Sequence, residues 1–164
     1  MRLQLSAPTS LLVSHRLEEF SCGEPALDEW LKRRALINHM SGASRTFVVA
    51  DQDQRVFGYY AMAAGAVAHQ LATGPIRRNM PDPVPIMVLA RLAVDMQAQG
   101  MQLGASLLQD AVNRAVAVSQ NAGVRALLVH AISERAKQFY ETYGFQVSPT
   151  HPMTLMLRLN QVKP

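Results

Sequence analysis

Cysteine is almost absent from this chain, because Cys22 is the only one among 164 residues. A disulfide within the chain needs two cysteines, so this kind of cross-link and any multi-cysteine metal site are excluded. The five histidines are scattered, and no two of them have the spacing of metal ligands on one helix. The sequence therefore predicts no metal site.

Long hydrophobic runs are missing as well. No stretch approaches the roughly 18 uninterrupted apolar residues of a membrane span, and the N-terminus lacks the basic-then-apolar pattern of a signal peptide. Hydrophobic residues make up 49% of the chain and charged residues 17%, a balance that is typical of globular proteins. We therefore expect a soluble, cytoplasmic protein without a membrane partner, folded as one α/β domain over residues 1–164.

Acidic residues are few in one part of the chain, which makes the charge uneven. Sixteen Lys and Arg against 12 Asp and Glu give a net charge of +4. Most of the excess lies within residues 30–91, where the acidic residues are Asp51, Asp53 and Asp82. The basic residues of that segment are Lys32, Arg33, Arg34, Arg45, Arg55, Arg77, Arg78 and Arg91. Such asymmetry favours a phosphate-rich partner, although a solvated basic surface would give the same pattern.

Hydrophobic periodicity and turn residues predict the order of the elements. Helices are expected after Pro25, over 104–120 and from Glu134, where Ser133 can act as the cap. The first helix is an amphipathic run whose residues at helical spacing are Leu27, Trp30, Leu31, Arg34, Ala35 and Asn38. The core-facing residues of the second are Leu107, Leu108, Ala111, Ala115 and Val118. Strands are expected over 46–50, 55–67, 86–94, 124–129 and 154–159, with 86–94 buried on both faces and 71–85 irregular. This order predicts a mixed sheet flanked by helices.

One segment has the pattern of an anion-binding turn. The apolar strand 88–94 leads through a turn containing Gly100 into the helix that starts near Gly104. Such a connection points backbone N–H groups and the positive end of a helix at one spot, which suits a pyrophosphate. A glycine before a helix is also ordinary turn chemistry, so this pattern alone leaves both interpretations open.

Together with the segment 136–145, this turn resembles the GNAT acetyltransferase family. The family pattern is an acidic-ended strand, a Q/R-x-x-G-x-G/A loop before a helix, and later A-x-x-F-Y-x-x-x-G-F, which is matched fully here. In the loop, Gln102 stands where the family usually has its middle glycine. The resemblance implies the GNAT fold, an α+β fold with a mixed, mostly antiparallel central sheet, and acetyl-CoA as co-substrate.

The resemblance also implies roles for particular residues. Tyr140 is expected to be the catalytic residue, a general acid. The residues expected to bind the coenzyme are Leu92, Ala93, Val94, Gln99, Gly100, Met101, Gln102, Leu103, Gly104, Ala105 and Phe139.

The N-terminal half is similar to one branch of the family, in the segments 20–23, 27–31 and 44–49. This branch comprises toxins of bacterial toxin–antitoxin modules that acetylate the amino group of the amino acid on charged tRNA, which stops translation. The resemblance implies aminoacyl-tRNA as the acceptor, a homodimer, and neutralisation by a ribbon-helix-helix antitoxin. The arginines expected to contact tRNA are Arg45, Arg77, Arg78 and Arg91, although Arg77 and Arg78 could also be solvated loop charges.

The residues fit this chemistry. The α-amine of an aminoacyl ester has a pKa below that of a free α-amino group, about 7.7–8.0, so much of it is neutral without a strong base. Backbone N–H groups near Leu92 and Val94 could hold the thioester oxygen, and Tyr140 could protonate the departing thiolate. Tyr140 could instead be a core aromatic with its hydroxyl at the surface.

Two other functions are also compatible with the sequence. The chain could acetylate a protein or small-molecule amine, although the basic segment 30–91 would repel cationic polyamines. It could also be a catalytically silent domain that binds CoA, but the presence of Tyr140 argues against this.

Overall fold

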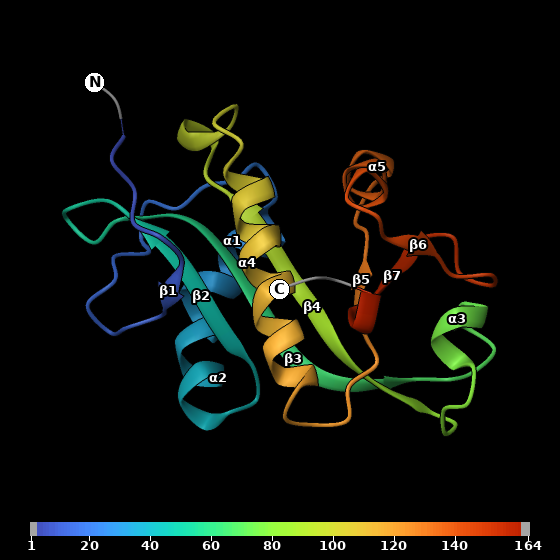
Figure 1. The fold of residues 1–164 in the computed structure, drawn as a ribbon. Coiled ribbons are helices and arrows are strands. Elements are labelled where there is room, and N and C mark those ends of the chain that lie inside the picture. The colour runs from blue at the N-terminus through green and yellow to red at the C-terminus, as the bar shows by residue number, and fades with distance from the viewer. Residues whose placement is uncertain (1–2, 162–164) are drawn as a thin grey trace. The chain divides into compact units, whose positions relative to one another are not determined.

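The computed structural model describes residues 3–161, and Figure 1 shows the order of the elements. The strands are β1 (Thr9–Ser10), β2 (Arg45–Ala50), β3 (Val56–Val67), β4 (Val84–Val94), β5 (Ala126–His130), β6 (Gln146–Val147) and β7 (Thr154–Arg158). The helices are α1 (Pro25–Trp30), the π-helical turn η1 (Leu31–Ala35), α2 (Leu36–Ser41), α3 (Gly74–Arg77), the 3-10 turn η2 (Met96–Ala98), α4 (Leu103–Ser119), α5 (Glu134–Thr142) and the 3-10 turn η3 (Leu159–Gln161). Within the described residues, no helix combines the length and the apolar character that a membrane span requires.

The strands form one sheet with the hydrogen-bonding order β1-β2-β3-β4-β5-β7-β6. β4 and β5 run parallel, whereas the pairs β1–β2, β2–β3, β5–β7 and β6–β7 are antiparallel. A mixed sheet flanked by helices was expected from the sequence, and this fold class is confirmed.

Contacts divide the chain into two compact units. Unit 1 runs to Ala63 and includes Arg91–Ala111, and unit 2 comprises Ala64–Ala90 and continues from Val112. That residues 1–164 form one domain stays a prediction, and residues 1–2 and 162–164 lie outside the described part.

In unit 1, alternate strand residues face different helices. One core joins η1 to the sheet and contains Leu11, Phe20, Leu31, Ala35, Val48, Ala50, Val56, Tyr59 and Ala93. The neighbouring residue Val49 points to the other face, as the period of a strand requires, and there meets α4. A Cβ atom on Gly58 would lie 3.0 Å from side-chain atoms of both Val49 and Leu107. The glycine therefore allows α4 to pack closely on the sheet.

The helical segment after Pro25 contains a π-helical turn that hydrophobic spacing did not predict. Leu31 and Ala35 are fully buried, as expected, but Arg34 is exposed. The placement of Arg34 on the apolar face is therefore wrong. A π-helical turn holds more residues than an α-helical one, so it rotates the residues within it away from the positions of an ideal helix.

Unit 2 has its own core, made of Val67, Ala72, Ile76, Val84, Ile86, Ala126, Leu128 and Met156. The segment 71–85, expected to be irregular, contributes to this core through α3, which has Pro75 in its first turn. In α5, the Ser133 hydroxyl accepts a hydrogen bond from the backbone N–H of Ala136 at 3.1 Å. The predicted cap of this helix is thereby confirmed.

β4 is less covered than the sequence suggested. Its apolar run predicted burial on both faces, yet Val88 and Leu92 are only half-buried and Ala90 is exposed. An apolar run does not by itself require burial on both faces, because apolar side chains also contribute to protein surfaces.

In α4, the buried positions include Leu107, Leu108, Ala111 and Ala115, as expected. Val112 and Val116 are also buried, whereas Val118 is half-buried, so the apolar stripe of the helix is turned slightly from the predicted one.

Candidate functional site

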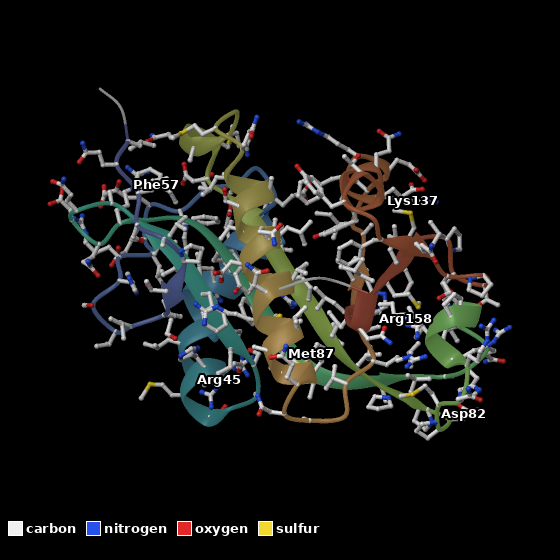
Figure 2. The ribbon with its side chains drawn as sticks, in the orientation of Figure 1. Arg45, Phe57, Asp82, Met87, Lys137 and Arg158 are labelled. Carbon is white, nitrogen blue, oxygen red and sulfur yellow. The ribbon has the colours of Figure 1, made fainter. Side chains whose placement is uncertain are left out.

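The end of β4 is fixed by Asp95, a buried carboxylate in unit 1. It accepts hydrogen bonds from the backbone N–H groups of Ser21 at 3.0 Å and Gln97 at 2.9 Å, one on each oxygen. The guanidinium of Arg55 lies 4.0 Å from this carboxylate and also covers the ring of Phe57, which Figure 2 labels. Because Asp95 caps η2 in this way, the chain leaves β4 along a fixed path.

The predicted coenzyme loop, residues 99–105, follows that turn. Gln99 anchors its start, because the side-chain amide donates hydrogen bonds to the carbonyls of Cys22 at 3.2 Å and Val94 at 3.1 Å. α4 begins at Leu103, one residue before the expected start. The first backbone N–H groups of a helix have no partner within it, so the loop has the helix-start geometry predicted for a pyrophosphate.

Two residues of this loop have a left-handed backbone. Gly100 has a φ of 85° and Gln102 has a φ of 59°. Glycine adopts such angles without strain, whereas a residue with a side chain is disfavoured there by about 1–2 kcal/mol. The glycine usual at this position of the family thus has a conformational reason, and Gln102 retains the backbone shape at a cost.

The side chains of Met101 and Leu103 face a hollow of about 470 Å³ in unit 1. The hollow is lined by Leu3, Leu5, Ser6, Ala7, Pro8, Val49, Met101, Leu103 and Ser106. Because these side chains are mostly apolar, any contact of Met101 or Leu103 with an anion would come from the backbone.

Replacing Gln102 with glycine is expected to raise the free energy of unfolding by up to about 1 kcal/mol, because relief of the left-handed strain exceeds the added chain entropy. Urea unfolding measures this change. Gln97→Gly is the matched control, since Gln97 lies in the same region without a positive φ, and there glycine should destabilise. A loss of stability in Gln102→Gly would contradict the conformational explanation.

Arg91 lies on the last part of β4, immediately before the expected coenzyme strand residues 92–94. Its guanidinium lies 4.6 Å from the centre of the Trp30 ring, in a cation–π contact. The side chain of Ala93 is buried in the core of unit 1, while Leu92 and Val94 are half-buried. A contact of Ala93 with the coenzyme would therefore also be made by its backbone.

The backbone N–H of Val94 is suitably placed for a contact with the coenzyme. The N–H of Asp95 donates to the carbonyl of Phe57 on β3 at 2.8 Å. Successive N–H groups of a strand point to opposite sides, so the N–H of Val94 points away from β3.

Arg45 is exposed at the start of β2, and Figure 2 shows it beside α2. Its guanidinium donates a hydrogen bond to the backbone carbonyl of His39. Desolvation, followed by the charge of Arg45, lowers the pKa of His39. Arg45 thus binds the last turn of α2 through this hydrogen bond and also carries a positive charge at the surface.

Tyr140 lies on α5 in unit 2 and is 6% exposed. It packs against Phe139 with ring centres 5.2 Å apart and against Phe145 at 5.5 Å. A tyrosine is protonated at neutral pH with its ordinary pKa of about 10, and burial raises the pKa of Tyr140 to about 12, so its phenol remains a proton donor. Phe139 also contacts Tyr143, so the expected coenzyme residue belongs to this aromatic group.

Arg77 and Arg78 lie at the end of α3, in a segment that is held firmly to unit 2. Arg77 donates to the carbonyls of His69 and Ala72 at 3.4 and 3.3 Å. Arg125 donates to three carbonyls of the same segment, those of Pro75, Ile76 and Arg78. Both arginines are exposed, but the Arg77 guanidinium donates to carbonyls of its own segment, so Arg78 has the side chain better placed for an external anion.

The structure thus gathers the expected residues in two groups. Residues 91–94 and 99–105 lie in unit 1 with Arg45, and Phe139 and Tyr140 lie in unit 2 with Arg77 and Arg78. Among the described residues, no group of three or more His, Cys, Asp or Glu is arranged to hold a metal ion.

Sequence reasoning missed the contacts of two residues near the candidate site. Asp95 was noted only as the acidic end of a strand, although an Asp two residues before Gln97 is a recognisable capping pattern. Trp30 was assigned to the core, and only its packing under Arg91 suggests more.

Residues 43–147 match the acetyltransferase (GNAT) domain. A relative from Mycobacterium tuberculosis, described as a tRNA-acetylating toxin, is 49% identical over 158 residues, which cover 96% of this chain and 95% of the relative.

Solved structures of toxins are also similar to this chain. AtaT complexed with acetyl-methionyl-tRNAfMet has a TM-score of 0.88 and 25% identity, covering 96% of each chain. A mutant AtaT toxin bound to the C-terminus of the antitoxin AtaR and to acetyl-CoA has a TM-score of 0.81 and 25% identity, covering 96% of this chain and 94% of the other.

These matches confirm the resemblance, the enzyme class and the co-substrate that the sequence motifs implied. The chain belongs to the GNAT acetyltransferase family and, within it, to the tRNA-acetylating toxins.

Proposed function

We propose that this protein transfers the acetyl group of acetyl-CoA to the α-amino group of the amino acid on charged tRNA and thereby blocks translation. The observation that carries the proposal is the 49% identity, over 96% of the chain, to a tRNA-acetylating toxin. The solved AtaT complex with acetyl-methionyl-tRNAfMet supports the same acceptor. An acetylated α-amine cannot attack a peptidyl ester, so each modified tRNA is lost to elongation.

In the proposed reaction, the substrate, the backbone and Tyr140 would each have a separate role. Part of the aminoacyl amine is already neutral at cellular pH, so the substrate supplies its own nucleophile. Backbone N–H groups near Leu92 and Val94 would hold the oxygen that becomes negative when the amine attacks the thioester. As the C–S bond breaks, Tyr140 would donate its phenolic proton to the departing thiolate, and the proton that the nitrogen loses as the amide forms would restore the phenol by way of solvent.

We further infer the partners of the family for this chain. It would act in the cytoplasm, where charged tRNA is found, as a homodimer that is neutralised by a ribbon-helix-helix antitoxin. The complex of AtaT with the C-terminus of AtaR supports an antitoxin partner.

Transfer of labelled acetyl from acetyl-CoA to a total pool of charged tRNA tests the proposal. We expect label on the charged pool, none on deacylated tRNA, and loss of the label when the ester is hydrolysed. Absence of label, with acetyl-CoA binding confirmed separately, would point instead to a protein or small-molecule amine.

The exposed Arg78 provides a test of tRNA docking. Arg78→Glu should raise the KM for charged tRNA by roughly 3- to 10-fold near physiological salt and reduce the slope of log KM against log salt by about one, because a phosphate contact is lost. Arg16→Glu is the control, since Arg16 lies in the acidic N-terminal part and pairs with Glu19. Equal KM values in the parent and in Arg78→Glu would show that this face does not bind tRNA.

A further inference from the structure

Trp30 is the only tryptophan of the chain and lies at the last position of α1. Its ring stacks on the ring of Tyr59, with centres 6.0 Å apart and an angle of 11° between the planes. Tyr59 is fully buried, and its hydroxyl donates to the carbonyl of Leu27 at 2.7 Å. The indole that lies under Arg91 is therefore held by a rigid neighbour.

This arrangement suits an arginine that must bind an anion. The guanidinium carbon of Arg91 lies over the Trp30 ring, 4.6 Å from its centre. The N–H donors of a guanidinium leave along its edge, so an aromatic ring and a phosphate can engage the group at the same time. The ring thus restrains where the Arg91 head can lie.

We propose that Trp30 is a positioning residue, which holds the Arg91 guanidinium so that its edge meets a phosphate at the acceptor end of charged tRNA. The inference rests on the proposed function, which makes charged tRNA the acceptor. Arg91 directly precedes the strand residues 92–94, whose backbone is proposed to hold the thioester, so the phosphate is one near the reacting end. The phosphates of acetyl-CoA have the same chemistry, and separate KM values distinguish the two sources.

Steady-state kinetics test the proposal. Trp30→Leu should raise the KM for charged tRNA by roughly 3- to 10-fold, with the KM for acetyl-CoA and kcat within about twofold of the parent, because a cation–π contact is lost. Trp30→Phe keeps an aromatic face and should restore most of the affinity. A rise confined to the KM for acetyl-CoA, or a fall in kcat alone, would overturn the assignment.

The double variant shows whether Trp30 acts through Arg91. Arg91→Gln should raise the KM for charged tRNA, and adding Trp30→Leu to it should change little more. If the two effects multiply, Trp30 acts independently and the proposal is wrong. Arg16→Gln, which removes one charge elsewhere in unit 1, should leave the KM unchanged, and thermal unfolding of every variant separates these effects from loss of fold.

The emission of Trp30 gives a reading that does not depend on turnover or on the Trp30 variants folding. Arg91→Gln should shift this emission, and charged tRNA should change it in the parent but much less in Arg91→Gln. Unchanged emission in both cases would overturn the proposal even when the parent acetylates charged tRNA. If the parent acetylates no charged tRNA, the proposed function itself fails, and the inference falls with it.

Discussion

Tyr140→Phe is expected to lower kcat for acetyl transfer by about 10²- to 10⁴-fold while the fold and the affinity for acetyl-CoA remain. The substitution deletes only the phenolic hydroxyl, and the ring keeps its contacts with Phe139 and Phe145. Single-turnover acetylation measures the chemical step, and calorimetry measures coenzyme binding. Together they separate loss of the acid from loss of binding.

A neighbouring tyrosine supplies the matched control. Tyr143 also contacts Phe139, but it is 48% exposed, so Tyr143→Phe removes a surface hydroxyl from the same helix end. We expect parental kcat in Tyr143→Phe. Parental kcat in Tyr140→Phe as well would remove Tyr140 from the mechanism.

The buried phenol also predicts how pH acts. Because burial raises the pKa of Tyr140 to about 12, the acid stays protonated and kcat should not fall on its account below that pH. An unfolded tyrosine has a pKa of about 10, so between pH 10 and 12 the unfolded state releases a proton that the folded state keeps. The free energy of unfolding should therefore decline in this window, and by less in Tyr140→Phe.

Asp95→Ala is expected to lower the free energy of unfolding by about 2–4 kcal/mol, as measured by urea unfolding. The alanine leaves the N–H groups of Ser21 and Gln97, whose hydrogen bonds to Asp95 are part-buried, without an acceptor and removes the carboxylate beside Arg55. Since η2 leads directly into the loop 99–105, the KM for acetyl-CoA should rise as well.

Asp53→Ala applies the same change at an exposed turn position and should alter stability by less than about 0.5 kcal/mol. If Asp95→Ala is equally mild, Asp95 does not hold the turn, and the geometry of the coenzyme loop must have another origin.

Features of the fold that depend on local chemistry could be predicted from the sequence. The long helix α4 follows from apolar residues at helical spacing, and the start of α5 follows from a Ser133 side chain that satisfies a helix N–H. The β2–β3 hairpin follows from two apolar runs around the polar turn 51–54.

Short or context-dependent features could not be predicted. β1 and β6 have two residues each, which is too few for any periodicity, and α3 has four. Arg34 was misplaced because a π-helical turn leaves no mark in hydrophobic spacing. The half-open surface of β4 was missed because an apolar sequence does not reveal what covers it.

The features of the candidate site also fall into those that the sequence could predict and those that it could not. The helix-start geometry of the loop could be anticipated from Gly100 and the apolar strand before it. The left-handed backbone of Gln102 could not, because a glutamine gives no sign of it. Tyr140 could be assigned as the catalytic acid only through a family motif. Physical reasoning alone also allowed it to be an aromatic residue of the core.

The tethering of α3 has a thermodynamic consequence. Fixing the backbone of a mobile loop on binding costs about 1–2 kcal/mol per residue in conformational entropy. In this protein, the contacts of Arg77, Arg125 and Ser148 order the segment around α3 during folding. A ligand that reaches Arg78 therefore meets a preorganised surface, and its association rate should depend on collision and ionic strength rather than on the ordering of a loop.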